Sequence, residues 1–210
     1  MGNGNKAEML IAVCAVITSV VALYIAWDQA RVMRLQQKAD VWPLLQIDQI
    51  NSVENGNLVY RMRIENAGVG PAFLERYVIA IPEEKQTTEL SRFYNYMVPE
   101  GLDAPTISNA SIVGRVMRDG RAISPFSLTW PYSEDSNQLF QDRIGEILRG
   151  ERDPAILFVC YCSILDDCWV TSSENVGRPS EVESCKSLPA IAALQSKPRA
   201  NNDTQEGARP

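Results

Sequence analysis

Residues 9–27 read MLIAVCAVITSVVALYIAW, an apolar run without a charged side chain. Its hydroxyl side chains, Thr18 and Ser19, can donate to carbonyl oxygens one turn back in the same helix. At 1.5 Å per residue a helix over this run covers roughly 28 Å, about the hydrocarbon thickness of a bilayer. Tyr24 and Trp27 stand where aromatic side chains favour the membrane interface. The run therefore predicts one transmembrane helix, with the rest of the chain outside the bilayer.

The residues that flank this run indicate that it is retained, and they set its orientation. Residues 27–31, Trp-Asp-Gln-Ala-Arg, contain no small-x-small cleavage site, which favours a signal-anchor over a cleaved signal peptide. Lys6 precedes the run, whereas Arg31, Arg34 and Lys38 follow it. Because basic residues near a span resist translocation, the sequence predicts a single-pass protein of the inner membrane with its soluble domain in the cytoplasm.

The composition agrees with an anchored globular domain and argues against nucleic acid as a partner. The formal net charge is -6, and residues 1–27 contain one lysine and one glutamate, so the remainder carries the whole acidic excess. No basic tract offsets this excess, and nucleic-acid binding depends on basic contacts to phosphates. Short runs rich in β-branched and aromatic residues favour strands in the soluble part.

The soluble part is predicted to be all-β: a mostly antiparallel, immunoglobulin-like β-sandwich with two covering helices. Pro43 ends the helical region, because the residue before a proline is pushed towards extended geometry. Strands are expected over 44–50, 58–65, 72–81, 111–117, 121–130, 155–164 and 168–172, and amphipathic helices over 84–98 and 133–150. The predicted organisation is a tail (1–8), a transmembrane helix (9–27), a juxtamembrane helical linker (28–41), the β-sandwich domain (42–173) and a largely disordered C-terminal tail (174–210).

A glycine-rich turn, Asn66-Ala67-Gly68-Val69-Gly70-Pro71-Ala72, joins two of the predicted strands. Asn66, Gly68 and Gly70 tolerate positive φ or close backbone approach, and Pro71, which has no N–H donor, suits the start of a strand. These residue types predict a structural corner of the sheet. The alternative is a loop whose amides bind an anion, but no Lys, Ser or Thr follows to hold a phosphate.

Three features can be compared with known sequences: Trp42-Pro43 shortly after a membrane helix, the Asn-x-Gly-x-Gly-Pro-Ala turn, and the stretch CYCSILDDCW over residues 160–169. Together they resemble a group of uncharacterised bacterial single-pass membrane proteins with a β-rich soluble domain. The resemblance covers residues 7–171. It implies a bacterial inner membrane, and it brings neither an activity nor site residues.

The soluble part contains four cysteines: Cys160, Cys162, Cys168 and Cys185. Cys160 and Cys162 are two residues apart in a predicted strand, so they share a face. If residues 165–167 form the hairpin loop, Ile164 pairs with Cys168 and three thiols lie on that face. Buried free cysteine is common in protein cores, so inert thiols are predicted, with a disulfide or a zinc site as the alternatives. The CxC spacing and the absence of histidine weigh against zinc.

The sequence predicts no enzyme, no cofactor, no bound metal and no catalytic residue. It contains no histidine, so a Ser-His-Asp or Cys-His nucleophile cannot be assembled, and it has no Walker A or dinucleotide-binding loop. The adjacent acids Asp166 and Asp167 are interpreted as solvated turn residues. Arg61, Arg63 and Arg115 are interpreted as solvated too, the alternative being a small basic surface for an anionic headgroup or an acidic partner.

Small residues line one side of the predicted membrane helix. At about 100° per residue they fall within an arc of roughly 80°, and the opposite side carries Val13 and Val20. Such a stripe lets two helix backbones approach closely in lipid. The expected partners are therefore membrane lipid and either a second copy of the chain or another membrane protein. The candidate helix–helix interface is Ala12, Ala15, Ser19, Ala22 and Ala26.

These features predict a membrane-anchored, non-enzymatic binding or assembly module, although the sequence names no ligand. Two other classes stay open. One is a periplasmic, disulfide-stabilised domain in the reversed orientation. The other is an enzyme or metal site that uses the cluster Cys160, Cys162 and Cys168.

Overall fold

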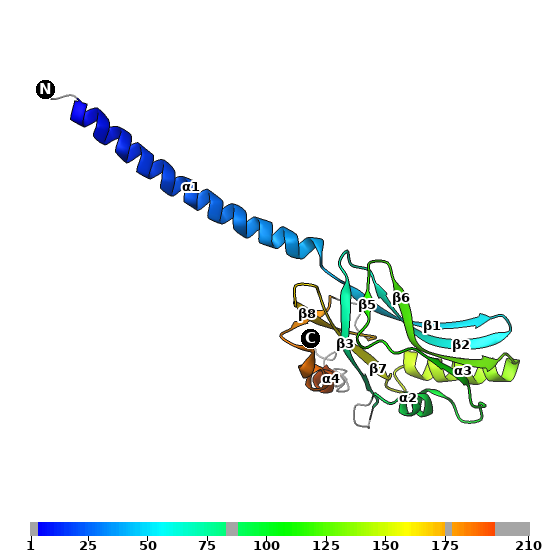
Figure 1. Cartoon of the computed structure of the whole chain (residues 1–210). Helices are drawn as coiled ribbons and strands as arrows, with labels where there is room; N and C mark the ends of the chain where they lie inside the picture. The colour runs from blue at the N-terminus through cyan, green and yellow to red at the C-terminus, as the bar shows by residue number, and fades with distance from the viewer. Residues whose placement is uncertain (1–3, 83–87, 175–177, 196–210) are drawn as a thin grey trace, which may run out of the picture. The chain divides into compact units, whose positions relative to one another are not determined.

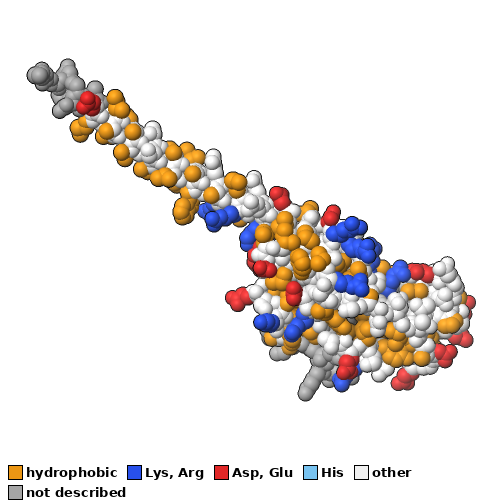
Figure 2. Space-filling view, in the orientation of Figure 1, with side chains coloured by type: hydrophobic (Ala, Val, Ile, Leu, Met, Phe, Trp, Pro, Cys, Tyr) orange, Lys and Arg blue, Asp and Glu red, His pale blue; other side chains and the backbone are white. Residues whose placement is uncertain are grey.

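The chain consists of two compact units that divide at residues 42 and 43, and the first is a long helix. The computed structural model describes residues 4–82, 88–174 and 178–195. Helix α1 (Gly4–Asp40) is long and apolar enough to cross a membrane, and from residue 8 onward its side chains are exposed (Figures 1 and 2). Thr18 and Ser19 donate to carbonyl oxygens one turn back, at 3.0 and 2.7 Å, as predicted. Neither hydroxyl therefore needs a partner outside the helix.

The second unit contains two antiparallel sheets, which confirms a β-rich fold that follows an apolar helix (Figure 1). The first sheet has the strand order β1-β2-β6-β4, and the second has the order β5-β3-β7-β8-β9. The strands are β1 (Leu45–Glu54), β2 (Asn57–Asn66), β3 (Ala72–Ala80), β4 (Thr106–Asn109), β5 (Val116–Met117), β6 (Ala122–Pro131), β7 (Ile156–Cys162), β8 (Cys168–Ser172) and β9 (Ser180–Val182).

The first sheet is built on the β1–β2 hairpin. Asn55 and Gly56 form its two-residue turn with φ angles of 50° and 74°, the left-handed geometry that an Asn-Gly pair adopts readily. This turn sets the register between the two strands. The alternation predicted for β2 is present, and its buried residues include Leu58, Tyr60, Met62 and Ile64.

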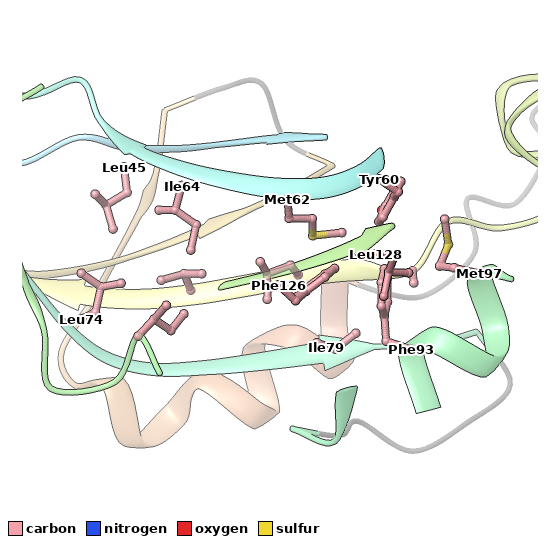
Figure 3. Close-up of a cluster of buried hydrophobic side chains, with 14 of the residues drawn as sticks. Leu45, Tyr60, Met62, Ile64, Leu74, Ile79, Phe93, Met97, Phe126 and Leu128 are labelled. Atoms are coloured by element: carbon pink, nitrogen blue, oxygen red, sulfur yellow. The ribbon is translucent and has the colours of Figure 1, made fainter. Parts of the chain in front are cut away.

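The main hydrophobic core lies between the two sheets (Figure 3). Side chains of β1, β2 and β6 meet those of β3 and β7, and helices α2 (Leu90–Met97) and α3 (Glu134–Leu148) add Phe93, Met97 and Phe140. The ring centroids of Phe93 and Phe126 are 4.7 Å apart, and those of Tyr60 and Phe93 are 6.0 Å apart. Aromatic side chains from both helices thus complete a core that the sheets alone leave open.

Both helices lie within the segments where helices were predicted. Ser133 caps α3, since its hydroxyl oxygen accepts a hydrogen bond from the backbone N–H of Ser136 at 3.0 Å. Glu134 and Asp135 in the first turn complement the helix dipole. Part of the segment predicted over 84–98 falls at residues 83–87, outside the described residues.

The second sheet buries apolar residues on both of its faces. Its outer face carries a separate hydrophobic cluster, which is covered by the 3-10 helix η1 (Cys185–Ser187) and by α4 (Leu188–Gln195). Leu188 and Ala192 of α4 have no exposed surface. The packed domain therefore extends beyond the predicted boundary at residue 173, because this short apolar helix seals the outer face of the sheet. The disorder expected for the last residues concerns 196–210, which lie outside the described residues.

One predicted strand is much shorter than expected. Residues 111–117 form a strand only at β5, and β4 arises from residues 106–109, where no strand was predicted. Gly114 explains the difference, since its φ of 77° turns the chain and its N–H donates to the carbonyl oxygen of Leu74 at 2.8 Å. An extended strand through this residue is incompatible with that geometry.

Candidate functional site

The four cysteines of the domain converge on the outer face of the second sheet. Cys160 and Cys162 come from β7, Cys168 begins β8, and Cys185 begins η1, which crosses that face. Cys162 and Cys168 are directly opposite in the β7–β8 ladder. The predicted pairing of Ile164 with Cys168 is therefore wrong by two residues. Because that shift is even, Cys160, Cys162 and Cys168 still share one face.

The thiols are paired as two disulfides, which corrects the prediction of inert free cysteines. Cys160 is bonded to Cys185 with a Cα–Cα distance of 5.5 Å, and Cys162 is bonded to Cys168 with a Cα–Cα distance of 4.0 Å. The first bond ties η1 and α4 to the sheet, and the second closes the β7–β8 hairpin. Among the described residues the only free cysteine is Cys14 of α1.

The two disulfides are in contact with each other but differ in burial. The Sγ atoms of Cys162 and Cys185 are 3.8 Å apart. Cys160 has no exposed surface, and Cys168 and Cys185 are 8% exposed, whereas Cys162 is half-buried. Attack on a disulfide requires access to a sulfur atom, so reagents in solvent reach the pair through Cys162.

The loop of the β7–β8 hairpin is held by its own hydrogen bonds. The N–H of Ser163 donates to the carbonyl oxygen of Asp167 at 2.8 Å, and the hydroxyl of Ser163 accepts from the N–H of Leu165 at 3.1 Å. Asp166 adopts a φ of 59°. At the tip, Ile164 is 51% exposed and Leu165 is 47% exposed. The disulfide and these bonds therefore present two apolar side chains to solvent on a fixed loop.

Asn66, the first residue of the glycine-rich turn, is fully buried and bonded through every polar atom. Its side-chain oxygen accepts from the N–H groups of Leu44 and Gly68, and its side-chain nitrogen donates to the carbonyl oxygens of Gly70 and Met117. Its backbone N–H donates to the carbonyl oxygen of Arg121, and its backbone oxygen accepts from the N–H of Gly120. These bonds join the start of β1, the turn, β5 and the segment before β6.

The other predicted turn residues surround this asparagine. Gly70 is buried, Gly68 is half-buried, and Pro71 directly precedes β3. The N–H of Ala67 donates to the carbonyl oxygen of Leu44, and the N–H of Gly68 donates to Asn66. Two amides that an anion-binding loop would offer are therefore used within the protein.

Two of the three arginines considered as a basic surface are joined to acids. Arg61 forms an ion pair with Glu54 at 2.8 Å, and Arg63 forms one with Glu65. The hydroxyl of Ser52 and the guanidinium of Arg61 hold the pKa of Glu54 below its usual value. Arg115 is exposed on the loop before β5. The positive charge available to an anionic ligand at the two strand arginines is accordingly reduced.

Two buried tyrosines have raised pKa values. Burial raises the pKa of Tyr60 well above its usual range, and its hydroxyl has no hydrogen-bond partner among the described residues. Burial raises the pKa of Tyr161 to about 12, partly offset by the N–H of Leu45, which donates to the Tyr161 hydroxyl at 3.3 Å. Both phenols are neutral at physiological pH, so neither offers a base for catalysis.

Sequence reasoning did not anticipate a surface depression of about 560 Å³ beside the C-terminal end of α3. The polar residues that line it interact with one another. The guanidinium of Arg152 lies 4.7 Å from the ring centroid of Tyr96, and the Tyr96 hydroxyl donates to the carbonyl oxygen of Asp153. Arg152 also approaches Glu146 at 3.6 Å. The lining residues are Pro82, Tyr96, Glu146, Glu151, Arg152 and Asp153.

The remaining predicted residues are the two acids of the β7–β8 loop and the small residues of α1. Asp166 is exposed and Asp167 is half-buried in the β7–β8 loop, a position that agrees with turn residues. The small residues of α1, from Ala12 to Ala26, are all exposed, as are Val13 and Val20 on the other side. Comparison with protein-family models, with curated proteins and with solved structures found no match to this chain.

Proposed function

We propose that this chain is a membrane-anchored, non-enzymatic binding module whose contact surface is the tip of the β7–β8 hairpin. The supporting observation is the exposure of Ile164 and Leu165 on a loop that the Cys162–Cys168 disulfide closes at its base. A loop already fixed in one conformation loses little entropy on binding, and apolar tips supply buried area. A partner with an apolar groove is the chemistry that this tip fits.

The scaffold is inferred to be an immunoglobulin-like sandwich. The order β1-β2-β6-β4 corresponds to strands A-B-E-D, and the order β3-β7-β8 corresponds to strands C-F-G, with β5 and β9 as additions. In such sandwiches the loops at the ends of the strands carry binding surfaces, since the framework holds them rigidly. The β7–β8 hairpin corresponds to the F–G loop.

The soluble domain is proposed to face the cytoplasm of a bacterial cell, with α1 as a signal-anchor in the inner membrane. Arg31, Arg34 and Lys38 follow the apolar run, whereas Lys6 precedes it. In a reducing compartment disulfides are transient and usually regulatory. The two disulfides then represent the oxidised form of a domain that cycles between two states.

The second candidate is a periplasmic domain for which the disulfides are permanent. Its support is the pairing of all four cysteines of the domain, since disulfides persist mainly in oxidising compartments. A reporter fused after residue 210 separates the two orientations. Cytoplasmic activity supports the first orientation, and periplasmic activity replaces it with the second.

The contact surface is tested by site-specific photocrosslinking in cells. A photoreactive residue at Ile164 or Leu165 is expected to form a discrete adduct, whereas one at Val53, which is 53% exposed elsewhere on the domain, is not. The adduct is also expected to weaken when Cys162 and Cys168 are both replaced by alanine. Equal labelling from all three positions, or none from the hairpin, would reject this surface.

The membrane helix is proposed to contribute a second contact, with another copy of the chain. Ala15, Ser19 and Ala22 lie on the exposed small-residue side of α1, and close backbone approach through small residues drives helix association in lipid. No catalytic group and no cofactor enters this proposal.

A further inference from the structure

We propose that the four cysteines, once reduced, form a zinc-thiolate site, so that the same residues hold either two disulfides or one metal ion. The geometry that carries this inference is the convergence of the Sγ atoms of Cys162, Cys168 and Cys185, all within 4.8 Å of one another. Cys160, bonded to Cys185, supplies the fourth sulfur.

The separation of the sulfur atoms fits a tetrahedral site. Thiolates that lie about 2.3 Å from a tetrahedral zinc ion are about 3.8 Å from one another. The Sγ atoms of Cys162 and Cys185, which are not bonded to each other, already stand 3.8 Å apart. After reduction each formerly bonded pair has to relax to that same separation, and the side chain of Cys160, which lies outside the group of three sulfur atoms, has also to turn towards Cys162 and Cys168.

The CxC spacing of Cys160 and Cys162 weighs against a zinc site built from β7 alone, but the fold brings other cysteines to the same face. Cys160 and Cys162 alone cannot enclose a metal ion, because both project from one face of β7. Cys168 joins them through the β7–β8 ladder, and Cys185 approaches from η1 above the same face. Three elements thus bring thiols together on one face of the sheet. Histidine is unnecessary, since four thiolates form a complete site.

The chemistry balances with a dithiol as the reductant. Each protein disulfide accepts two electrons and two protons from one dithiol, which becomes a disulfide, so two dithiols yield four thiols. Zinc then binds the four thiolates and releases four protons. Oxidation by a disulfide-class oxidant reverses the sequence and expels the metal ion. The inference takes only its source of reductant from the cytoplasmic orientation proposed above.

The expected consequence is a change at the hairpin. In the oxidised form a bond between Cys162 and Cys168 fixes the base of the loop that carries Ile164 and Leu165. In the metal form the same two side chains turn towards a shared ion, and η1 is held by the ion through Cys185. When zinc is removed from the reduced protein, neither the end of the β7–β8 loop at Cys168 nor η1 at Cys185 is linked to the cysteines of β7 by a disulfide or a metal ion.

The test uses the full chain in detergent, treated anaerobically with a phosphine reductant and then titrated with Co²⁺ and with Zn²⁺. Reduced protein is expected to bind one ion per chain, to show the visible absorption of tetrahedral cobalt thiolate, and to protect four cysteines from alkylation. Oxidised protein is expected to bind none. Far-UV circular dichroism reports whether the fold persists, and reduction in the presence of Zn²⁺ covers the case in which the metal-free reduced domain unfolds.

Two variants sharpen the result. Cys162→Ser keeps the buried Cys160–Cys185 pair for folding but removes one ligand, so the cobalt absorption and the metal affinity are both expected to fall. Cys14→Ser removes the free cysteine of α1, and its metal binding is expected to equal that of the wild type. The inference is overturned by reduced wild type that binds no ion, with Zn²⁺ present throughout, or by undiminished binding in Cys162→Ser. A periplasmic reporter result would reject the orientation yet leave the metal stoichiometry unchanged.

Discussion

The side-chain nitrogen of Asn66 donates to the carbonyl oxygen of Met117 at 3.0 Å, which links the end of β2 in the first sheet to β5 in the second. This bond spans 51 positions in the chain. It is one of the polar contacts that fix how the two sheets are joined at the glycine-rich turn.

Asn66→Asp is expected to destabilise the domain severely. An aspartate of the same shape loses both donors, so the buried carbonyl oxygens of Gly70 and Met117 each lose a hydrogen bond and face a carboxylate oxygen instead, at about 1–3 kcal/mol each. Asn109→Asp, on the exposed strand β4, is the matched control and is expected to change stability by less than about 0.5 kcal/mol. Thermal and urea unfolding measure both. Similar stabilities for the two variants would contradict the role assigned to Asn66.

One chemical change, glycine to alanine, is expected to have opposite effects at two positions. Gly56 has a φ of 74° in the β1–β2 turn, so Gly56→Ala should lower the free energy of unfolding by about 1 kcal/mol. Gly145 lies inside α3, where alanine is favoured by up to about 1 kcal/mol. The new methyl group at Gly145 meets only the movable end of Arg149. Urea unfolding measures the change in the free energy of unfolding for each variant. Two changes of the same sign would refute the prediction.

The two buried tyrosines should respond differently to removal of the hydroxyl. Tyr60→Phe removes a buried group without a partner among the described residues, so stability is expected to stay level or to rise by up to about 1 kcal/mol. Tyr161→Phe leaves the N–H of Leu45 without its acceptor and is expected to cost about 1–3 kcal/mol. Calorimetry measures the melting temperatures of Tyr60→Phe and Tyr161→Phe, and Tyr161→Phe is expected to melt at the lower temperature. The order of the two melting temperatures is the critical observation.

Stability is also expected to fall at alkaline pH. The pKa of Tyr161 is raised to about 12, whereas an unfolded tyrosine ionises near pH 10. Below pH 10 the phenol is protonated in both the folded and the unfolded state, so its contribution to stability is fully present. Between about pH 10 and 12 the phenol ionises in the unfolded state but stays protonated in the folded state, which lowers the free energy of unfolding. Tyr161→Phe should lessen this decline in unfolding titrations, and Tyr60, whose pKa burial also raises, accounts for the decline that remains. An unchanged pH profile in that variant would assign the decline to other groups.

The two disulfides should differ in contribution and in ease of reduction. The Cys160–Cys185 bond closes 25 residues and the Cys162–Cys168 bond closes 6, which correspond to about 3.5 and about 2 kcal/mol on the chain-entropy relation. Replacement of Cys160 and Cys185 by alanine is therefore expected to lower stability more than replacement of Cys162 and Cys168 by alanine. Limited reduction followed by alkylation should label Cys162 and Cys168 first, because Cys162 is the most exposed of the four cysteines of the domain. First labelling at Cys160 would contradict the assignment.

Helix α1 offers a test of the proposed self-association. Ala15→Ile with Ala22→Ile adds bulk to the small-residue side of α1, whereas Val13→Ile with Val20→Ile adds less bulk to the other side. Crosslinking in membranes is expected to detect a dimer that the first pair abolishes and the second retains. Wild type without a dimer, or equal crosslinking in both variants, would discard self-pairing.

Elements whose signal lies within a short stretch could be predicted from the sequence. The apolar helix, the alternation of β2 and the capped helix after Ser133 each carry their own pattern, and each is present. The Asn55-Gly56 pair is also a local signal for the β1–β2 hairpin. Asn66 was expected at a structural corner, but its bond to Met117 depends on where β5 arrives.

The candidate site could not be predicted because it depends on register and on distant segments. The β7–β8 loop runs from residue 163 to 167, and Asp166 rather than a glycine adopts the positive φ within it, so the sequence contained no sign of a five-residue loop. Cys185 falls in the segment 174–210, where the sequence predicts a largely disordered tail. It reaches Cys160 because η1 and α4 cover a sheet face whose exposure only the assembled fold reveals.

The contacts of Asn66 also imply an order of folding events. The β1–β2 hairpin needs only its own two strands and a two-residue turn, so it can form within about 1–10 μs. The bonds from Asn66 to Met117, Gly120 and Arg121 must wait until segments more than 50 positions away have arrived. The turn that joins the sheets is thus expected to close late, after β6 has docked on β2. Until then the ends of both sheets stay open to solvent, and the slow step of folding is the arrival of the distant strands.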